Sequence, residues 1–84
     1  MNMTETEFTK QMNSFLLSSG IYQGRRGYWS FIRISYRFHK NTNMKKEKED
    51  AKTNYRLFYK ILASLRIRGK YNEYTKLLYG DKDE

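Results

Sequence analysis

The chain has 84 residues, a net charge of +8 at pH 7, no cysteine and no proline. This length allows one small domain with a single core. The absence of cysteine excludes disulfides, thiolate nucleophiles and cysteine-bound zinc. No apolar run approaches the roughly 18 residues of a membrane span, and the N-terminal residues lack an apolar signal-peptide core. We therefore expect one small basic domain over 1–84, in the cytoplasm and away from membranes.

The positive charge is concentrated in the middle of the sequence. Residues 25–70 hold 14 of the 17 lysines and arginines but only three of the nine acidic residues. The last four residues, 81–84, are mostly acidic, and we expect them to form a disordered tail. A segment as basic as 25–70 attracts polyanions over long range and binds them in a salt-dependent way.

A first helix is predicted over residues 5–18. Thr4 and Glu7 have the spacing of a capping box, and Gly20 is placed to end the helix in a left-handed conformation. One face of this segment is apolar, through Phe8, Met12, Phe15 and Leu16.

Residues 21–27 form a predicted loop in which Arg25 and Arg26 lie between Gly24 and Gly27. Free backbone amides at the start of a following helix, beside two arginines, suit a phosphate group. The glycine spacing matches neither the dinucleotide fingerprint nor the Walker loop. A turn with two solvated arginines therefore remains the alternative.

Residues 28–40 are the stretch on which the fold depends, and they give conflicting signals. Their residue types favour a strand. At about 100° per residue, however, the apolar side chains share one wide face and the polar ones the opposite side. A strand would also need partner strands that the rest of the chain does not offer. We expect a helix whose narrow basic ridge comprises Ser30, Arg33, Arg37 and Lys40, with a strand over 28–38 as the alternative.

Two more helices are predicted in the second half. The first runs over about 44–67 and ends near Gly69, with Lys52, Arg56 and Lys60 stacked on one side. The second runs over about 71–79 and ends at Gly80. The fold class is therefore all-α, a small bundle of three to four helices; the alternative is α+β with 28–38 as a strand.

The sequence offers no reaction centre. His39 is the only histidine and has basic neighbours at Arg37 and Lys40, so we expect it at the surface or at a helix end. The carboxylates Glu47, Glu49 and Asp50 would suit magnesium, with Lys52 nearby, but neighbours at i, i+1 and i+2, as in Asp50-Ala51-Lys52, do not face one another on a helix, and the surrounding lysines would neutralise such a site. We expect no enzymatic activity, no metal and no cofactor.

The first functional hypothesis is binding to nucleic acid or to a nucleoprotein. Lysine and arginine supply phosphate contacts, and an exposed aromatic side chain stacks on unpaired bases. No known nucleic-acid-binding module is evident. The candidate residues are Arg25, Arg26, Arg33, Arg37, Lys40, Lys52, Arg56, Lys60, Arg66, Arg68, Lys70 and Trp29.

The second hypothesis is inhibition of a larger protein machine by direct contact. Tyrosine and arginine are enriched at interface hot spots. Ten lysines, eight tyrosines, six asparagines and no proline indicate an A/T-rich gene, as is common in phages and mobile elements. Small anti-defence proteins, including anti-CRISPR proteins, belong to this class. The partner would then be a nucleic-acid-processing protein complex, and a homodimer is also compatible with the sequence.

Overall fold

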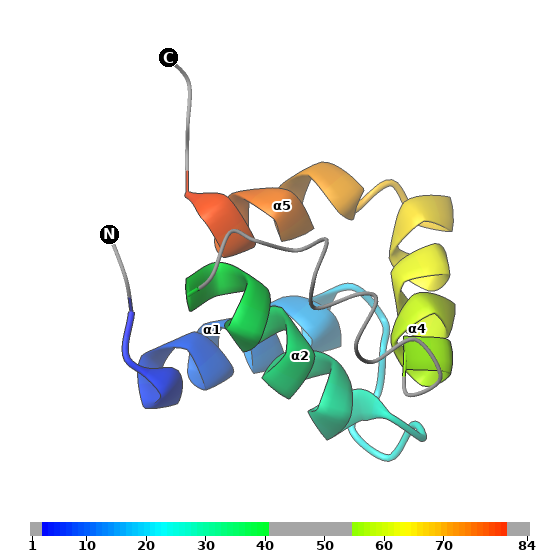
Figure 1. The fold of residues 1–84 in the computed structure, drawn as a ribbon. Helices are drawn as coiled ribbons and strands as arrows, with labels where there is room; N and C mark the ends of the chain where they lie inside the picture. The colour runs from blue at the N-terminus through cyan, green and yellow to red at the C-terminus, as the bar shows by residue number, and fades with distance from the viewer. Residues whose placement is uncertain (1–2, 41–54, 81–84) are drawn as a thin grey trace.

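The structure is a computed structural model that describes residues 3–40 and 55–80. The described residues form four helices and no strand: α1 (Glu5–Ser18), α2 (Tyr28–Lys40), α4 (Arg56–Ile67) and α5 (Tyr71–Tyr79) (Figure 1). The predicted all-α bundle is confirmed, and the alternative of a strand over 28–38 is wrong. None of the helices in the described part of the chain is long and apolar enough to span a membrane.

The central element is α2, which packs against α1, α4 and α5. In Figure 1 it crosses the front of the molecule, with α5 above it and α4 to its right. One helix can contact three others only if its apolar face is wide. On α2 this face is formed by Tyr28, Phe31, Ile32, Ser35, Phe38 and His39, all of them buried.

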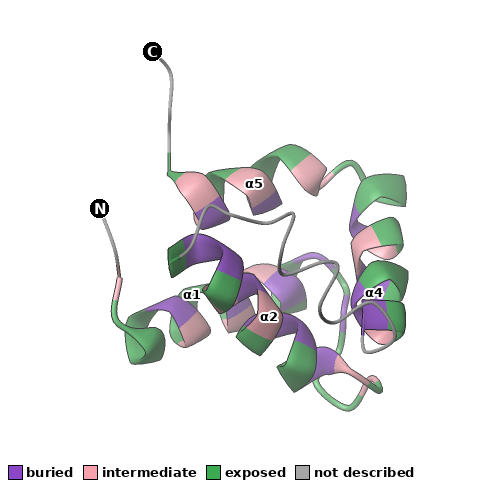
Figure 2. Ribbon diagram, in the orientation of Figure 1, coloured by how far each residue is buried: buried purple, intermediate pink, exposed green. Residues whose placement is uncertain are grey.

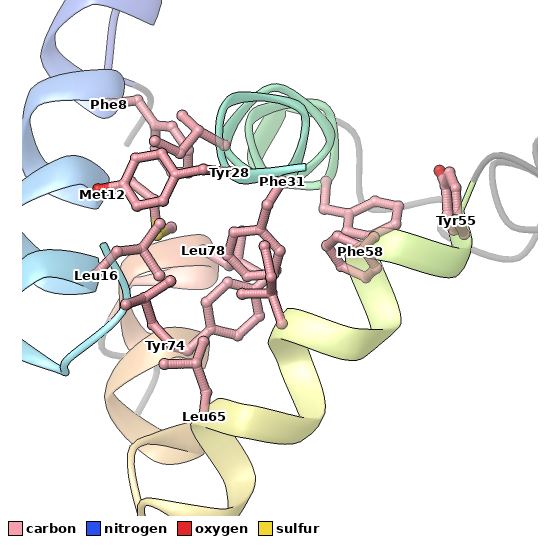
Figure 3. Packing of buried hydrophobic residues seen from close by; sticks show 14 residues of the cluster. Phe8, Met12, Leu16, Tyr28, Phe31, Tyr55, Phe58, Leu65, Tyr74 and Leu78 are labelled. Carbon is pink, nitrogen blue, oxygen red and sulfur yellow. The ribbon is translucent and has the colours of Figure 1, made fainter. Parts of the chain in front are cut away.

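The core between the helices is rich in aromatic rings (Figure 3). Phe31 of α2 stacks on Phe58 of α4 at 5.0 Å between ring centroids and lies 5.4 Å from Tyr74 of α5. Phe38 meets Phe58 edge-on at 5.7 Å. Aromatic pairs add about 0.5–1.5 kcal/mol each beyond the apolar area they bury. These contacts therefore fix the orientation of α2 relative to α4 and α5.

Helix α1 begins and ends where the sequence predicts. The hydroxyl oxygen of Thr4 accepts a hydrogen bond from the Glu7 amide at 3.2 Å. At the other end, Gly20 has φ of +90° and its amide donates to the carbonyl of Leu17, while the Ile21 amide donates to that of Leu16. This pair of bonds is a Schellman motif, which a glycine in the left-handed region completes without strain.

The structure describes only part of the third predicted helix. Helix α4 covers Arg56–Ile67 and ends shortly before Gly69, as predicted. Residues 44–54, including Lys52, lie outside the described residues, as does the predicted acidic tail 81–84. Helix α5 matches the predicted range 71–79 and is followed by Gly80 with φ of +76°.

His39 lies in the last turn of α2, as the helix-end alternative predicted, but it is not a surface residue. Its side chain is buried and stacks on Phe8 at 5.0 Å between ring centroids. Its Nε2 accepts a hydrogen bond from the Met3 amide at 3.1 Å, and its Nδ1 lies 2.7 Å from the Leu78 carbonyl oxygen. His39 follows Tyr28 by 11 residues, about three helical turns, so it occupies the same buried face despite its basic neighbours.

Candidate nucleic-acid interface

The outward side of α2 carries a line of side chains that we call the α2 ridge: Trp29, Arg33, Arg37 and Lys40. Their spacing of four, four and three residues places them on one face of the helix. All four are exposed, and the indole of Trp29 is 52% accessible. In Figure 2 such exposed segments alternate along α2 with the buried ones that face the core. Because the opposite face is committed to the core, the ridge points to solvent.

The cations of the ridge form a short linear array. At 1.5 Å per residue, Arg33 and Arg37 are about 6 Å apart along the helix axis, and Arg37 and Lys40 about 4.5 Å. The Lys40 Nζ lies 5.3 Å from the ring centroid of Tyr36, a cation–π contact that orients it along the helix. Arg37 and Lys40 are in the last turn, where positive charge complements the helix dipole.

A cleft of about 160 Å³ lies beside the ridge, between α1 and α2. We call it the α1–α2 cleft. Trp29 and Arg33 belong to both the ridge and the cleft. The full lining is Glu5, Thr9, Trp29, Ile32, Arg33 and Tyr36. An exposed aromatic ring, a guanidinium and a carboxylate therefore meet in one small hollow.

Acidic side chains are confined to helix starts in the part of the chain that the structure describes. Glu5 and Glu7 lie in the first turn of α1, and Glu73 lies in the first turn of α5. Negative charge at these positions is favourable to the helix dipole. Away from these two helix starts, the charged surface over 3–40 and 55–80 is cationic.

A second basic surface lies between α1 and α5. This open hollow of about 700 Å³, the α1–α5 groove, contains the three lysines Lys10, Lys70 and Lys76. Lys70 pairs with Glu73 at 3.5 Å. Lys10 and Lys76 are not among the binding residues predicted from the sequence, because only the packing of α5 near α1 brings together residues so far apart in the chain. At about 100° per residue, Lys10 faces a different side of α1 from Glu5 and Thr9, so the groove and the cleft are separate surfaces.

Two of the predicted binding residues lie between the end of α1 and α4. Arg25 is partly buried, and its guanidinium donates a hydrogen bond to the Ser64 hydroxyl of α4 at 3.1 Å. Arg68 is exposed, and its guanidinium lies next to Gly20, at the end of α1. Arg25 therefore links the loop before α2 to α4. Arg26 follows Arg25 in the loop before α2, and its side chain is exposed.

The loop before α2 is shaped by packing. A Cβ atom at Gly27 would lie only 2.7 Å from the Cβ of Leu57. The Tyr28 amide, at the start of α2, donates to the Arg25 carbonyl at 3.0 Å. That amide is therefore engaged within the loop, which weakens the interpretation of 24–27 as a phosphate-binding turn.

The remaining predicted cations lie on or next to α4. Arg56 and Lys60 are exposed, and the Arg66 guanidinium lies 4.7 Å from the ring centroid of Tyr71. Lys70 belongs to the α1–α5 groove. The structure thus separates the described members of the predicted set into the α2 ridge, a group on α4 and at its C-terminal end, the two arginines of the loop before α2, and Lys70 in the α1–α5 groove.

Burial raises the pKa of three tyrosines. Desolvation is the main cause for Tyr74, Tyr28 and Tyr79 alike. The Tyr28 hydroxyl donates to the Asn13 side-chain oxygen at 2.6 Å, and the Tyr74 hydroxyl shares a hydrogen bond with Ser35 at 2.8 Å. These phenols belong to the packing of the bundle and are separate from the ridge.

Comparison with models of protein families, with curated proteins and with solved structures finds no match for this chain. The features of this chain that bear on its function are therefore the α2 ridge, the α1–α2 cleft and the α1–α5 groove.

Proposed function

We propose that this protein binds nucleic acid through the α2 ridge and catalyses no reaction. The observation that supports this function is the alignment of an exposed indole with three cations on one helix face, Trp29, Arg33, Arg37 and Lys40. Phosphate contacts supply most of the sequence-independent affinity for nucleic acid, and aromatic stacking on unpaired bases adds to it. The ridge offers both within one helix.

The two kinds of side chain have separate roles. Arg33, Arg37 and Lys40 contact successive phosphates, because the array runs along the helix as a strand backbone would. Trp29 lies at the N-terminal end of this array, where its indole stacks on a base. The overall positive charge accelerates the encounter with a polyanion.

The proposal is tested with two double variants of equal charge change. Arg33→Glu with Arg37→Glu alters the ridge, and Lys10→Glu with Lys76→Glu alters the α1–α5 groove. The binding of a fluorescent oligonucleotide of about ten nucleotides is titrated at about 50 mM and about 200 mM salt. Because both variants lose the same net charge, a difference between them reports the location of the interface.

The ridge variant is expected to bind at least tenfold more weakly at low salt than the groove variant. Each lost phosphate contact should also lower the slope of log affinity against log salt by about 0.7–0.9. Equal losses in the two variants would show that only net charge matters. A larger loss in the groove variant would move the interface to α1 and α5.

A second candidate function is contact with a nucleic-acid-processing protein, as an inhibitor of the phage or mobile-element type. The supporting observation is the exposure of three large apolar side chains, Leu17, Tyr22 and Ile67, which are 46%, 66% and 85% accessible. The Arg68 guanidinium lies next to Gly20, so the C-terminal ends of α1 and α4 are close together. Exposed large apolar side chains mark a protein interface when they form a continuous patch.

The two functions give opposite results with Ile67→Glu. A protein partner that binds through Ile67 should be lost from affinity purification with the variant, whereas oligonucleotide binding should change only by the effect of one added negative charge. Retention of the same partner by the variant would exclude Ile67 from its docking site.

A further inference from the structure

We propose that the α1–α2 cleft receives one unpaired guanine base of a bound strand. This inference rests on the proposed function, since the strand is the one held on the α2 ridge. It adds a specificity that phosphate contacts cannot supply, because the phosphates are the same at every nucleotide.

The size of the cleft suits a single ring system. Its volume of about 160 Å³ is well below the roughly 300 Å³ at which pockets for drug-sized ligands begin. Two aromatic residues, Trp29 and Tyr36, are among those that line it, and a flat base stacks favourably on aromatic rings.

The charges of the cleft select against simple ions. Glu5 disfavours a free anion, and Arg33 disfavours a cation such as an alkylated ammonium group. Within the described residues 3–40 and 55–80, no ion pair joins Glu5 to Arg33. A neutral ring with hydrogen-bond donors on one edge and an attached phosphate satisfies both groups at once. A nucleotide has this combination of features.

The carboxylate of Glu5 favours guanine among the bases. An ionised carboxylate has two acceptor oxygens and no donor. Guanine presents two neighbouring donors, N1–H and the N2 amino group, on its Watson–Crick edge, whereas each of the other bases presents a donor at only one position of that edge. Glu5 can therefore accept two hydrogen bonds from guanine and one from any other base.

The geometry gives each remaining group a role. Trp29 supplies the stacking surface, and Arg33 binds a phosphate of the same strand where the cleft opens onto the ridge. Thr9 adds a hydroxyl that both donates and accepts. Because Trp29 is the only tryptophan, its fluorescence reports directly on the occupancy of the cleft.

The test compares four oligonucleotides of about ten nucleotides, each a uridine tract with one central position occupied by G, A, C or U. Binding is followed by Trp29 fluorescence with the full-length protein. Glu5→Gln removes the charge but keeps the side-chain length. Glu7→Gln is the matched control, because Glu7 is also in the first turn of α1 but is not part of the cleft. GMP alone is titrated as well.

The wild-type protein is expected to bind the G-containing strand at least about fivefold more tightly than the other three, since a bidentate contact discriminates by 1 kcal/mol or more. Tryptophan fluorescence should be quenched most by that strand. Glu5→Gln should abolish the preference for G, so that the four strands bind with the same affinity, and Glu7→Gln should retain the preference. GMP should bind much more weakly than the strand, because it lacks the contacts with the ridge.

Equal binding of all four strands by the wild-type protein would overturn the guanine site but leave the phosphate-binding ridge intact. Retention of the G preference by Glu5→Gln would also overturn it. Equally tight binding of GMP would assign the cleft to a free nucleotide and not to a strand. If no strand binds even at low salt, the proposed function itself is wrong.

Discussion

The Nδ1 atom of His39, near the end of α2, lies 2.7 Å from the carbonyl oxygen of Leu78 in α5. The other ring nitrogen accepts a hydrogen bond from the Met3 amide, which precedes α1. Because Nε2 accepts, the Nδ1 carries the proton and donates to Leu78. One neutral imidazole therefore joins three parts of the chain that are remote in sequence.

Replacing His39 with leucine is expected to lower the free energy of unfolding by about 2 kcal/mol. The variant keeps an apolar side chain but leaves the Leu78 carbonyl and the Met3 amide without this partner, and buried groups left unsatisfied cost about 1–3 kcal/mol each. Urea denaturation followed by circular dichroism measures the change. Lys40→Ala, at the neighbouring exposed position, is the control, with an expected change within about 0.5 kcal/mol. Equal effects of the two substitutions would contradict the structural role of His39.

Stability should fall in alkaline solution. Burial raises the pKa of Tyr74 above the ordinary value of 10.0, although the hydrogen bond with Ser35 acts in the opposite direction. A folded-state pKa above the unfolded value means that the unfolded chain binds fewer protons at high pH. Stability is then full below the unfolded pKa and is lost as pH rises through the folded one. Tyr28 and Tyr79 act in the same direction.

The measurement is the free energy of unfolding between about pH 8 and pH 11. It should decrease above pH 10, by up to about 1.4 kcal/mol per pH unit for each buried tyrosine. Tyr74→Phe combined with Ser35→Ala removes the phenol and its partner together and should give a shallower decrease. Tyr22→Phe removes a phenol that is 66% exposed and is the control. An unchanged slope in the Tyr74 variant would exclude this phenol as a source of the alkaline instability.

Alanine substitutions at Gly27 and Gly69 distinguish the cost of backbone strain from the cost of a steric clash in the core. Gly27 has φ of +84°, and a Cβ there would approach the Leu57 Cβ to 2.7 Å, whereas Gly69 has φ of +72° and nothing within 4 Å of such a Cβ. Gly69→Ala should therefore cost only the left-handed conformation, about 1–2 kcal/mol. Gly27→Ala should cost more, because α2 and α4 must also move apart. Thermal and urea denaturation of the two variants would measure this difference, and equal losses would show that the contact with Leu57 relaxes freely.

The helix boundaries follow largely from local sequence. The cap at Thr4 and the glycines at positions 20, 69 and 80 act within one helical turn, so the sequence predicted the extents of α1 and α5 and the end of α4. The period of the apolar residues in 28–40 also outweighed their preference for strands. The third predicted helix is tested only over its described part, where α4 covers Arg56–Ile67; the rest of the predicted range, 44–54, lies outside the described residues.

Which polar side chains of α2 are buried and which are exposed was only partly predictable without the tertiary structure. Helical spacing identified the exposed ridge Arg33–Arg37–Lys40, since a face opposite to the core must meet solvent. The sequence did not predict the burial of His39 and Ser35, and only Leu78, Met3 and Tyr74 provide the partners that make this burial stable.

The sequence by itself determined four features of this protein: its all-α class, three of its helix ends, its cationic middle and the ridge of α2. These depend on contacts within a few residues, which the local order of side chains specifies. Only the tertiary structure decided that Glu5 shares a cleft with Trp29 and Arg33, and that Lys10 shares a groove with Lys76. Such pairs depend on how whole helices pack, and packing is set by the entire core at once.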